Sequence, residues 1–129
     1  MLKMRPAQML MRIVSEKGFV DWYVKEFMPD NLPEFHQALS TESLEDMVRS
    51  GRKAAMAYGF SEPDSIFHFV TLMWIVGPNF MDFSGFKEAL ECKDLDEAGR
   101  IDALYNVDSE LSAEAIINAD DTAWWRIHP

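Results

Sequence analysis

Apolar residues recur along most of the chain at the three- and four-residue spacing of helices that bury one face. This spacing predicts helices over about 6–18, 19–27, 41–58, 62–76, 83–92, 95–105 and 112–117, with a further short piece at 35–39. Nowhere does a convincing alternation of apolar and polar residues predict a strand. The pattern therefore predicts an all-α fold, a compact bundle of about six to seven helices.

Prolines and glycines mark the ends of the first helices. Pro6 suits a first helical turn, because its missing N–H would be unpaired there in any case. Gly18 marks the expected end of that first helix. Pro29 and Pro33 predict a turn over residues 28–33, since proline interrupts a helix interior.

The helix over 41–58 carries end signals on both sides. Ser40 or Thr41 is its expected N-cap. Gly59 follows where a left-handed residue commonly ends a helix, and Phe60 can make the accompanying hydrophobic contact. We therefore expect a sharp helix end at Gly59.

The next helix, over 62–76, is the expected centre of the fold. Ser61 is its expected N-cap, with Pro63 in the first turn and Asp64 reaching back as a capping-box acid. Its residues from 66 to 76 are apolar nearly all round, which is typical of a helix surrounded by others. Gly77 begins the Gly-Pro-Asn turn that ends it. The residues expected to have structural roles are Gly59, Ser61, Trp74, Gly77 and Phe80.

The length and composition fit one globular domain. The chain has 129 residues, of which 48% are hydrophobic and 12% aromatic. These values lie far from those of disordered chains, and the length is that of a typical domain. We expect a single helical domain over 1–129, in which 117–129 forms an aromatic C-terminal tail.

The charge limits the classes of partner. Twenty-two acidic and twelve basic side chains give a net charge of −10, which repels nucleic acid and anionic membrane surfaces and favours basic partners. The most apolar segment, 66–76, is about half as long as a membrane span. With a single cysteine, Cys92, and no signal-peptide pattern at the N-terminus, we expect a cytoplasmic protein with Cys92 as a small core residue.

No motif of known catalytic or metal chemistry is present. His36, His68 and His128 lack a second ligand at metal-binding spacing, and His68 is expected to be a buried, hydrogen-bonded structural residue. The acidic run that begins at Asp94 resembles a calcium loop, but Tyr105 stands where its bidentate carboxylate is needed. Nucleophile elbows, phosphate loops and zinc-protease motifs are absent from the sequence. We expect neither an enzyme nor a bound cofactor or metal.

The C-terminal tail offers the best candidate surface for a partner. Tryptophan and arginine are enriched at binding hot spots. Two adjacent tryptophans on one helix cannot both face inward, although a chain end that docks an aromatic side chain on its own core is also common. The candidate partner-binding residues are Asp120, Asp121, Trp124, Trp125 and Arg126.

The middle of the chain resembles a bacterial family. The segments that carry the resemblance are Ala57-Tyr58-Gly59-Phe60, Phe69-Val70-Thr71-Leu72-Met73 and Gly77-Pro78-Asn79-Phe80. They are similar to a helix end, a core helix and a turn of small helical proteins encoded beside effector and spike genes in type VI secretion clusters. The resemblance covers about residues 5–105. The family tends to have an acidic turn followed by a proline where this chain has residues 81–85.

The resemblance implies an accessory protein that binds a cognate effector or secretion component, either to neutralise it as an immunity protein or to load it as a chaperone or adaptor. A small-molecule binder with an apolar cavity lined by Phe69, Met73 and Trp74 is the alternative. An enzyme that uses His68 with a carboxylate would require a solvent-reachable pocket there. A homodimer that pairs an apolar face such as Trp22 and Tyr23 also stays open.

Overall fold

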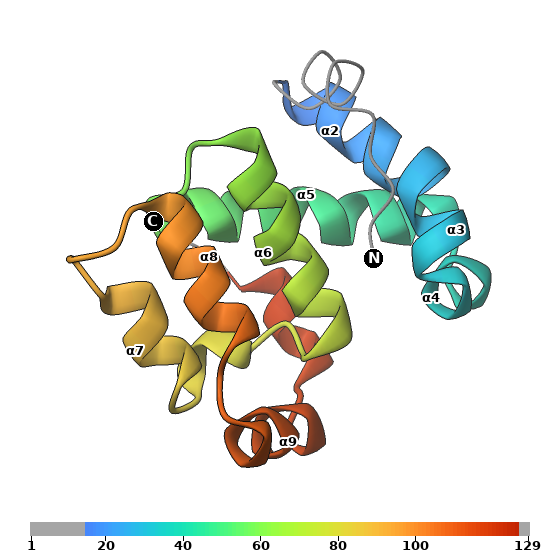
Figure 1. Cartoon of the computed structure of the whole chain (residues 1–129). Helices are drawn as coiled ribbons and strands as arrows, with labels where there is room; N and C mark the ends of the chain where they lie inside the picture. The colour runs from blue at the N-terminus through green and yellow to red at the C-terminus, as the bar shows by residue number, and fades with distance from the viewer. Residues whose placement is uncertain (1–14, 127–129) are drawn as a thin grey trace. The chain divides into compact units, whose positions relative to one another are not determined.

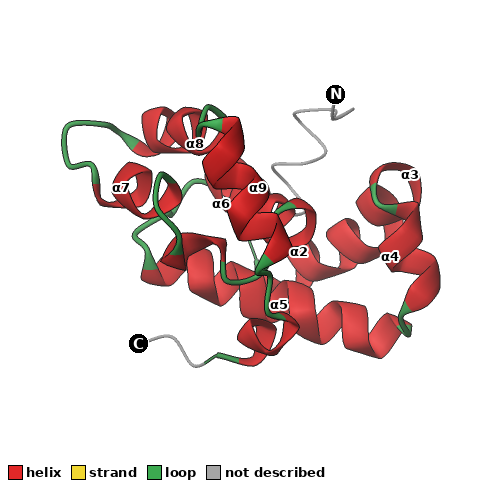
Figure 2. Ribbon diagram, turned by 90° about the horizontal axis from the view of Figure 1, so that it is seen from below, coloured by secondary structure: helices red, strands yellow, loops and turns green. Residues whose placement is uncertain are grey.

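The computed structural model describes residues 15–126, and every regular element in that range is helical (Figure 1 and Figure 2). The predicted all-α class is thereby confirmed. Contacts divide the chain into two compact units, residues 1–50 and 51–129, which we call the N-terminal and C-terminal units. The single domain over 1–129 stays a prediction. Most of the predicted helix over 6–18, which begins at Pro6, lies outside the described residues.

The first described helix begins earlier than the helix predicted over 19–27. Helix α2 (Glu16–Trp22) has Ser15 as its N-cap, whose hydroxyl accepts from the Gly18 N–H at 3.0 Å. The predicted helix end at Gly18 is therefore wrong. Serine is a strong N-cap, and a glycine in the first turn after such a cap does not end a helix.

The predicted turn over 28–33 is also wrong over most of its length. A π-helical segment, η1 (Tyr23–Phe27), continues α2, and α3 (Met28–Asn31) follows without a break. Pro29 follows directly after the π-helical segment, and the helix continues through it to Asn31. The helix ends only at Leu32, which precedes a second proline and has φ −133° and ψ 54°. Helix α4 (Pro33–Ala38) then covers the short piece predicted at 35–39.

The core of the N-terminal unit is aromatic. The Tyr23 ring lies 5.5 Å from that of Phe19 and 4.8 Å from that of Phe27, between ring centroids. The Trp22 ring lies 5.7 Å from the Phe27 ring. Tyr23 is fully buried, so its side chain is not presented to a second copy of the chain.

Helix α5 (Thr41–Ala57) begins and ends as predicted. The Ser40 hydroxyl accepts from the Ser43 N–H at 3.2 Å. Gly59 has φ +92°, its N–H donates to the Met56 carbonyl, and the Phe60 N–H donates to the Ala55 carbonyl at 3.1 Å. These two bonds form a Schellman motif, which confirms the predicted structural role of Gly59.

Helix α6 (Pro63–Ile75) is capped differently from the prediction. Its N-cap is Glu62 rather than Ser61, and the capping acid is Glu97 rather than Asp64. Glu97 accepts from the N–H of Ser61 and of Glu62 at 3.0 Å each, and from the Ser61 hydroxyl at 2.8 Å. A carboxylate from another helix satisfies the free donors at this helix start, so the local cap that the sequence offered is not used.

Helix α6 forms the middle of the C-terminal unit, as predicted for residues 62–76. Trp74 is buried on this helix, and Phe80 is fully buried in the 3-10 turn η2 (Phe80–Asp82) that follows. Gly77 has φ +148° and ends the helix. A Cβ at that position would lie 2.8 Å from the Ala119 Cβ, so only glycine fits this close approach. The buried side chains of α6 are Ser65, Ile66, Phe67, Phe69, Val70, Thr71, Leu72, Met73 and Trp74.

Three helices follow, and each begins at a different residue from the one predicted. Helix α7 (Phe86–Glu91) begins three residues later than predicted, after Gly85 at φ +89°. Helix α8 (Glu97–Tyr105) lies beside α6 (Figure 1) and has Asp96 as its N-cap. Helix α9 (Ser109–Ile117) begins three residues earlier than predicted, because Asp108 accepts from the Glu110 N–H. Cys92, after α7, is half-buried rather than a core residue.

Candidate functional site

The C-terminal tail is docked by one of its two tryptophans. The segment forms a 3-10 helix, η3 (Asp121–Trp125), in which Trp124 is 1% exposed and its ring centroid lies 4.5 Å from that of Trp74. Trp125 is 57% exposed. The two neighbours therefore divide the roles that the sequence left open, since Trp124 belongs to the core and only Trp125 presents its indole to a partner.

The other predicted tail residues also have defined positions. Asp120 accepts from the N–H and the hydroxyl of Thr122, at 3.0 and 2.6 Å, and these hydrogen bonds lower the pKa of the Asp120 carboxyl. The guanidinium of Arg126 donates to both oxygens of Asp82, at 3.3 and 3.0 Å. Asp121 is exposed. The tail is thus fixed by internal contacts at both of its ends.

Two exposed isoleucines lie just before this tail, at the end of α9. Ile116 is 51% and Ile117 is 80% exposed, and Ala115 is the buried residue of that helix. The residues after them are held firmly. Asn79 donates to the Asn118 carbonyl at 3.2 Å and accepts from the Asp120 N–H at 2.9 Å. The isoleucines therefore stand on an anchored segment and not on a free end.

The charge around α9 has a single sign. Between Arg100 and Arg126 the sequence contains no lysine or arginine. The acids in this interval are Asp102, Asp108, Glu110, Glu114, Asp120 and Asp121. Arg126, the base that follows this interval, is engaged by Asp82. We call Ile116, Ile117, Trp125 and the exposed acids of 108–121 the α9 surface.

Of the α9 surface, the sequence pattern predicted only the tail residues as candidates for binding. Ile116 and Ile117 were not predicted to be exposed. The spacing of Ala115, Ile116 and Ile117 does not say which of three adjacent apolar residues faces inward. The base-free interval between Arg100 and Arg126 was readable from the sequence and would have been the signal.

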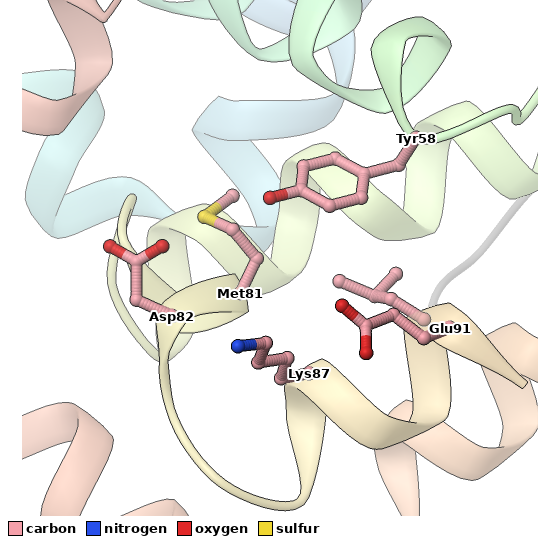
Figure 3. A pocket seen from close by; sticks show the side chains of 6 residues that line it. Tyr58, Met81, Asp82, Lys87 and Glu91 are labelled. Atoms are coloured by element: carbon pink, nitrogen blue, oxygen red, sulfur yellow. The ribbon is translucent and has the colours of Figure 1, made fainter.

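A separate hollow of about 290 Å³ lies between η2, α7 and the end of α5 (Figure 3). Met81 and Leu90 are buried beneath it, and the phenol ring of Tyr58 forms one side. The charged side chains that line it are Asp82, Lys87 and Glu91. Burial and the nearby Asp82 carboxylate raise the pKa of the Tyr58 hydroxyl, which keeps the phenol protonated.

His68, on α6, lies beside α8 and has two polar neighbours. Its Nδ1 lies 2.8 Å from the Tyr105 hydroxyl oxygen, and its Nε2 lies 3.8 Å from an Asp64 oxygen. Burial lowers the pKa of His68, although Asp64 acts in the opposite direction. Burial also raises the pKa of Tyr105 to about 12. His68 is hydrogen-bonded, as predicted, but half-buried, and it does not line the hollow.

No group of three or more His, Cys, Asp or Glu side chains in residues 15–126 is placed to hold a metal ion. Within the same residues, no helix has the length and apolar character needed to cross a membrane.

The chain matches no protein-family model, no curated protein and no solved structure.

Proposed function

We propose that the chain is a non-enzymatic, protein-binding accessory of a bacterial secretion cassette, and that the α9 surface binds its partner. One observation carries the protein-binding part of the proposal, and the secretion cassette is what the resemblance in the sequence implies. Ile116 and Ile117 are exposed on an anchored helix inside a stretch of chain with six acids and no base. Exposed apolar side chains rimmed by charge are typical of protein-binding surfaces.

The same surface indicates the chemistry of the partner. A protein that presents apolar side chains beside lysines or arginines would bury the isoleucines and neutralise the acids around them. A second copy of this chain would bring the same acids face to face, which disfavours a homodimer through this surface. The proposed partner is a cognate effector with a basic, partly apolar face.

The proposal is tested by affinity purification of the tagged full chain from its own host, read by mass spectrometry. The double variant Ile116→Ser/Ile117→Ser is compared with the wild type. Leu95→Ser is the matched control, because Leu95 is 40% exposed and lies outside α9, in the loop before α8. Stoichiometric capture of one basic protein by the wild type and by Leu95→Ser, but not by the double variant, is the expected result.

Two outcomes would contradict the proposal. Equal capture by all three proteins would remove α9 as the binding surface. Absence of any stoichiometric protein partner would overturn the accessory function itself. Thermal unfolding of each variant is measured alongside, and we expect little change, because substitutions at exposed positions typically alter stability by about 0.5 kcal/mol or less.

The immunity and adaptor roles differ in what the partner does when bound. An immunity protein would abolish the toxicity of the effector in a growth assay. An adaptor would leave toxicity unchanged and would be needed for export of the effector. The Ile116→Ser/Ile117→Ser variant should lose whichever of these two activities the wild type has.

A further inference from the structure

We propose that the hollow beside α7 binds a small zwitterion with an apolar side chain, of the class of free α-amino acids. This site is separate from the α9 surface and does not depend on the accessory function. The apolar base, the charges at the rim and the size of the hollow all favour this class of ligand.

The base of the hollow suits an apolar side chain. Met81 and Leu90 are buried, and the Tyr58 ring is held in place by the ring of Phe69, 5.8 Å away between centroids. A side chain that entered here would displace water from the Tyr58 face and from the edges of Met81 and Leu90. Met81 and Leu90 are only 3% and 5% exposed, so this contact adds to recognition by the charged rim and does not replace it.

The rim carries one available cation and one available anion. Lys87 and Glu91 stand one helical turn apart on α7, and both side chains border the hollow (Figure 3). Among residues 15–126, neither side chain forms an ion pair, whereas Asp82 is engaged by Arg126. The rim therefore offers a site for a carboxylate at Lys87 and a site for an ammonium group at Glu91.

The Tyr58 hydroxyl adds a hydrogen-bond donor on the same side. Because its phenol stays protonated, it can donate to a ligand carboxylate that also accepts from Lys87. A ligand with only one of the two charged groups would leave either Lys87 or Glu91 without compensation. This requirement distinguishes a zwitterion from a fatty acid or an amine.

The size of the hollow sets an upper limit on the ligand. A volume of about 290 Å³ lies at the lower end of small-molecule sites, which span roughly 300–1,000 Å³. A free leucine or methionine fits such a space, whereas a nucleotide does not. We therefore use L-leucine and L-methionine as probes.

The experiment is a titration of the full chain followed by two-dimensional NMR. L-Leucine is compared with N-acetyl-L-leucine, which lacks the ammonium group, and with L-leucinamide, which lacks the carboxylate. We expect saturable shifts near Tyr58 and α7 with leucine, and at least a tenfold weaker affinity for each blocked compound. We also expect Lys87→Met and Glu91→Gln each to weaken leucine binding at least tenfold.

Matched controls are Lys93→Met and Glu114→Gln, which remove the same charges outside the hollow and should bind leucine as the wild type does. Three results would overturn the proposal. These are the absence of saturable shifts with both amino acids, equal affinity for leucine and its blocked forms, or unchanged binding in Lys87→Met and Glu91→Gln.

Discussion

At the scale of single residues, Gly59 shows how one backbone angle ends a helix. Its φ of +92° lies in the region that residues with a Cβ rarely adopt. The nearest atom to an added Cβ would be an Arg100 nitrogen at 3.9 Å, so a substitution meets no crowding there. A loss of stability at this position therefore reflects backbone strain and not a clash of the added Cβ.

We predict that Gly59→Val lowers the free energy of unfolding by more than about 1 kcal/mol, because a β-branched residue tolerates positive φ poorly. Gly59→Asn should lose less, since asparagine visits the left-handed region more readily. Urea unfolding of the three proteins measures both values. Equal stability of Gly59→Val and the wild type would contradict the Schellman assignment.

His68 makes the stability of the folded chain depend on pH. Its pKa is lowered from the usual 6.5 by burial, so the unfolded chain binds the proton more readily than the folded chain does. The stabilising contribution of neutral His68 is therefore fully present above about pH 6.5 and is lost as the pH falls through the lower pKa of the folded state.

We predict that the wild type loses more stability than His68→Gln when the pH is lowered from about 7.5 to below the usual histidine pKa of about 6.5. Glutamine does not titrate in this window, so the difference between the two proteins isolates His68 from the carboxyl groups. Urea unfolding at both values of pH measures it. A larger loss in His68→Gln would show that the sign of the pKa shift is wrong.

At the scale of elements, Glu97 joins the starts of α6 and α8. Burial would raise the pKa of its carboxyl, but hydrogen bonds from Glu62 and Ser61 outweigh that effect and lower it. We predict that Glu97→Ala costs about 0.5–2 kcal/mol, as loss of a helix cap does. Asp94→Ala, an exposed acid outside any cap, is the control. Thermal unfolding of the two variants decides, and equal stability would contradict a capping role.

The elements also show where the sequence was sufficient. The apolar run over 66–76 identified the central helix of its unit, and Gly59 and Gly77 identified two helix ends, because these signals are local. Glu97 could not be found in this way, since it caps a helix start about 35 positions earlier in the chain. The helix across Met28 and Pro29 was missed because a π-helical segment leads directly into it.

At the scale of the whole molecule, the candidate sites depend on contacts that sequence spacing does not encode. The sequence draws attention to the two tryptophans of the tail, but only packing against Trp74 decides that Trp124 is buried and Trp125 is exposed. The hollow at Tyr58 combines residues from three elements, none of which carries a motif. The net charge of −10, in contrast, was known from composition and acts on every encounter with a partner.

This charge leads to a prediction about the proposed complex. Attraction between the α9 surface and a basic partner is screened as salt rises, because the Debye length falls from about 10 Å at 0.1 M to about 3 Å at 1 M. An Asp108→Asn/Glu110→Gln/Glu114→Gln variant should therefore show a smaller salt dependence of association than the wild type. The Ile116→Ser/Ile117→Ser variant should dissociate faster but keep the salt dependence of the wild type. Surface plasmon resonance at several salt concentrations separates the two effects.

An association rate independent of salt in the wild type would favour an adaptor that holds an apolar segment of the effector, and a steep decline would favour an immunity protein that covers a basic cleft.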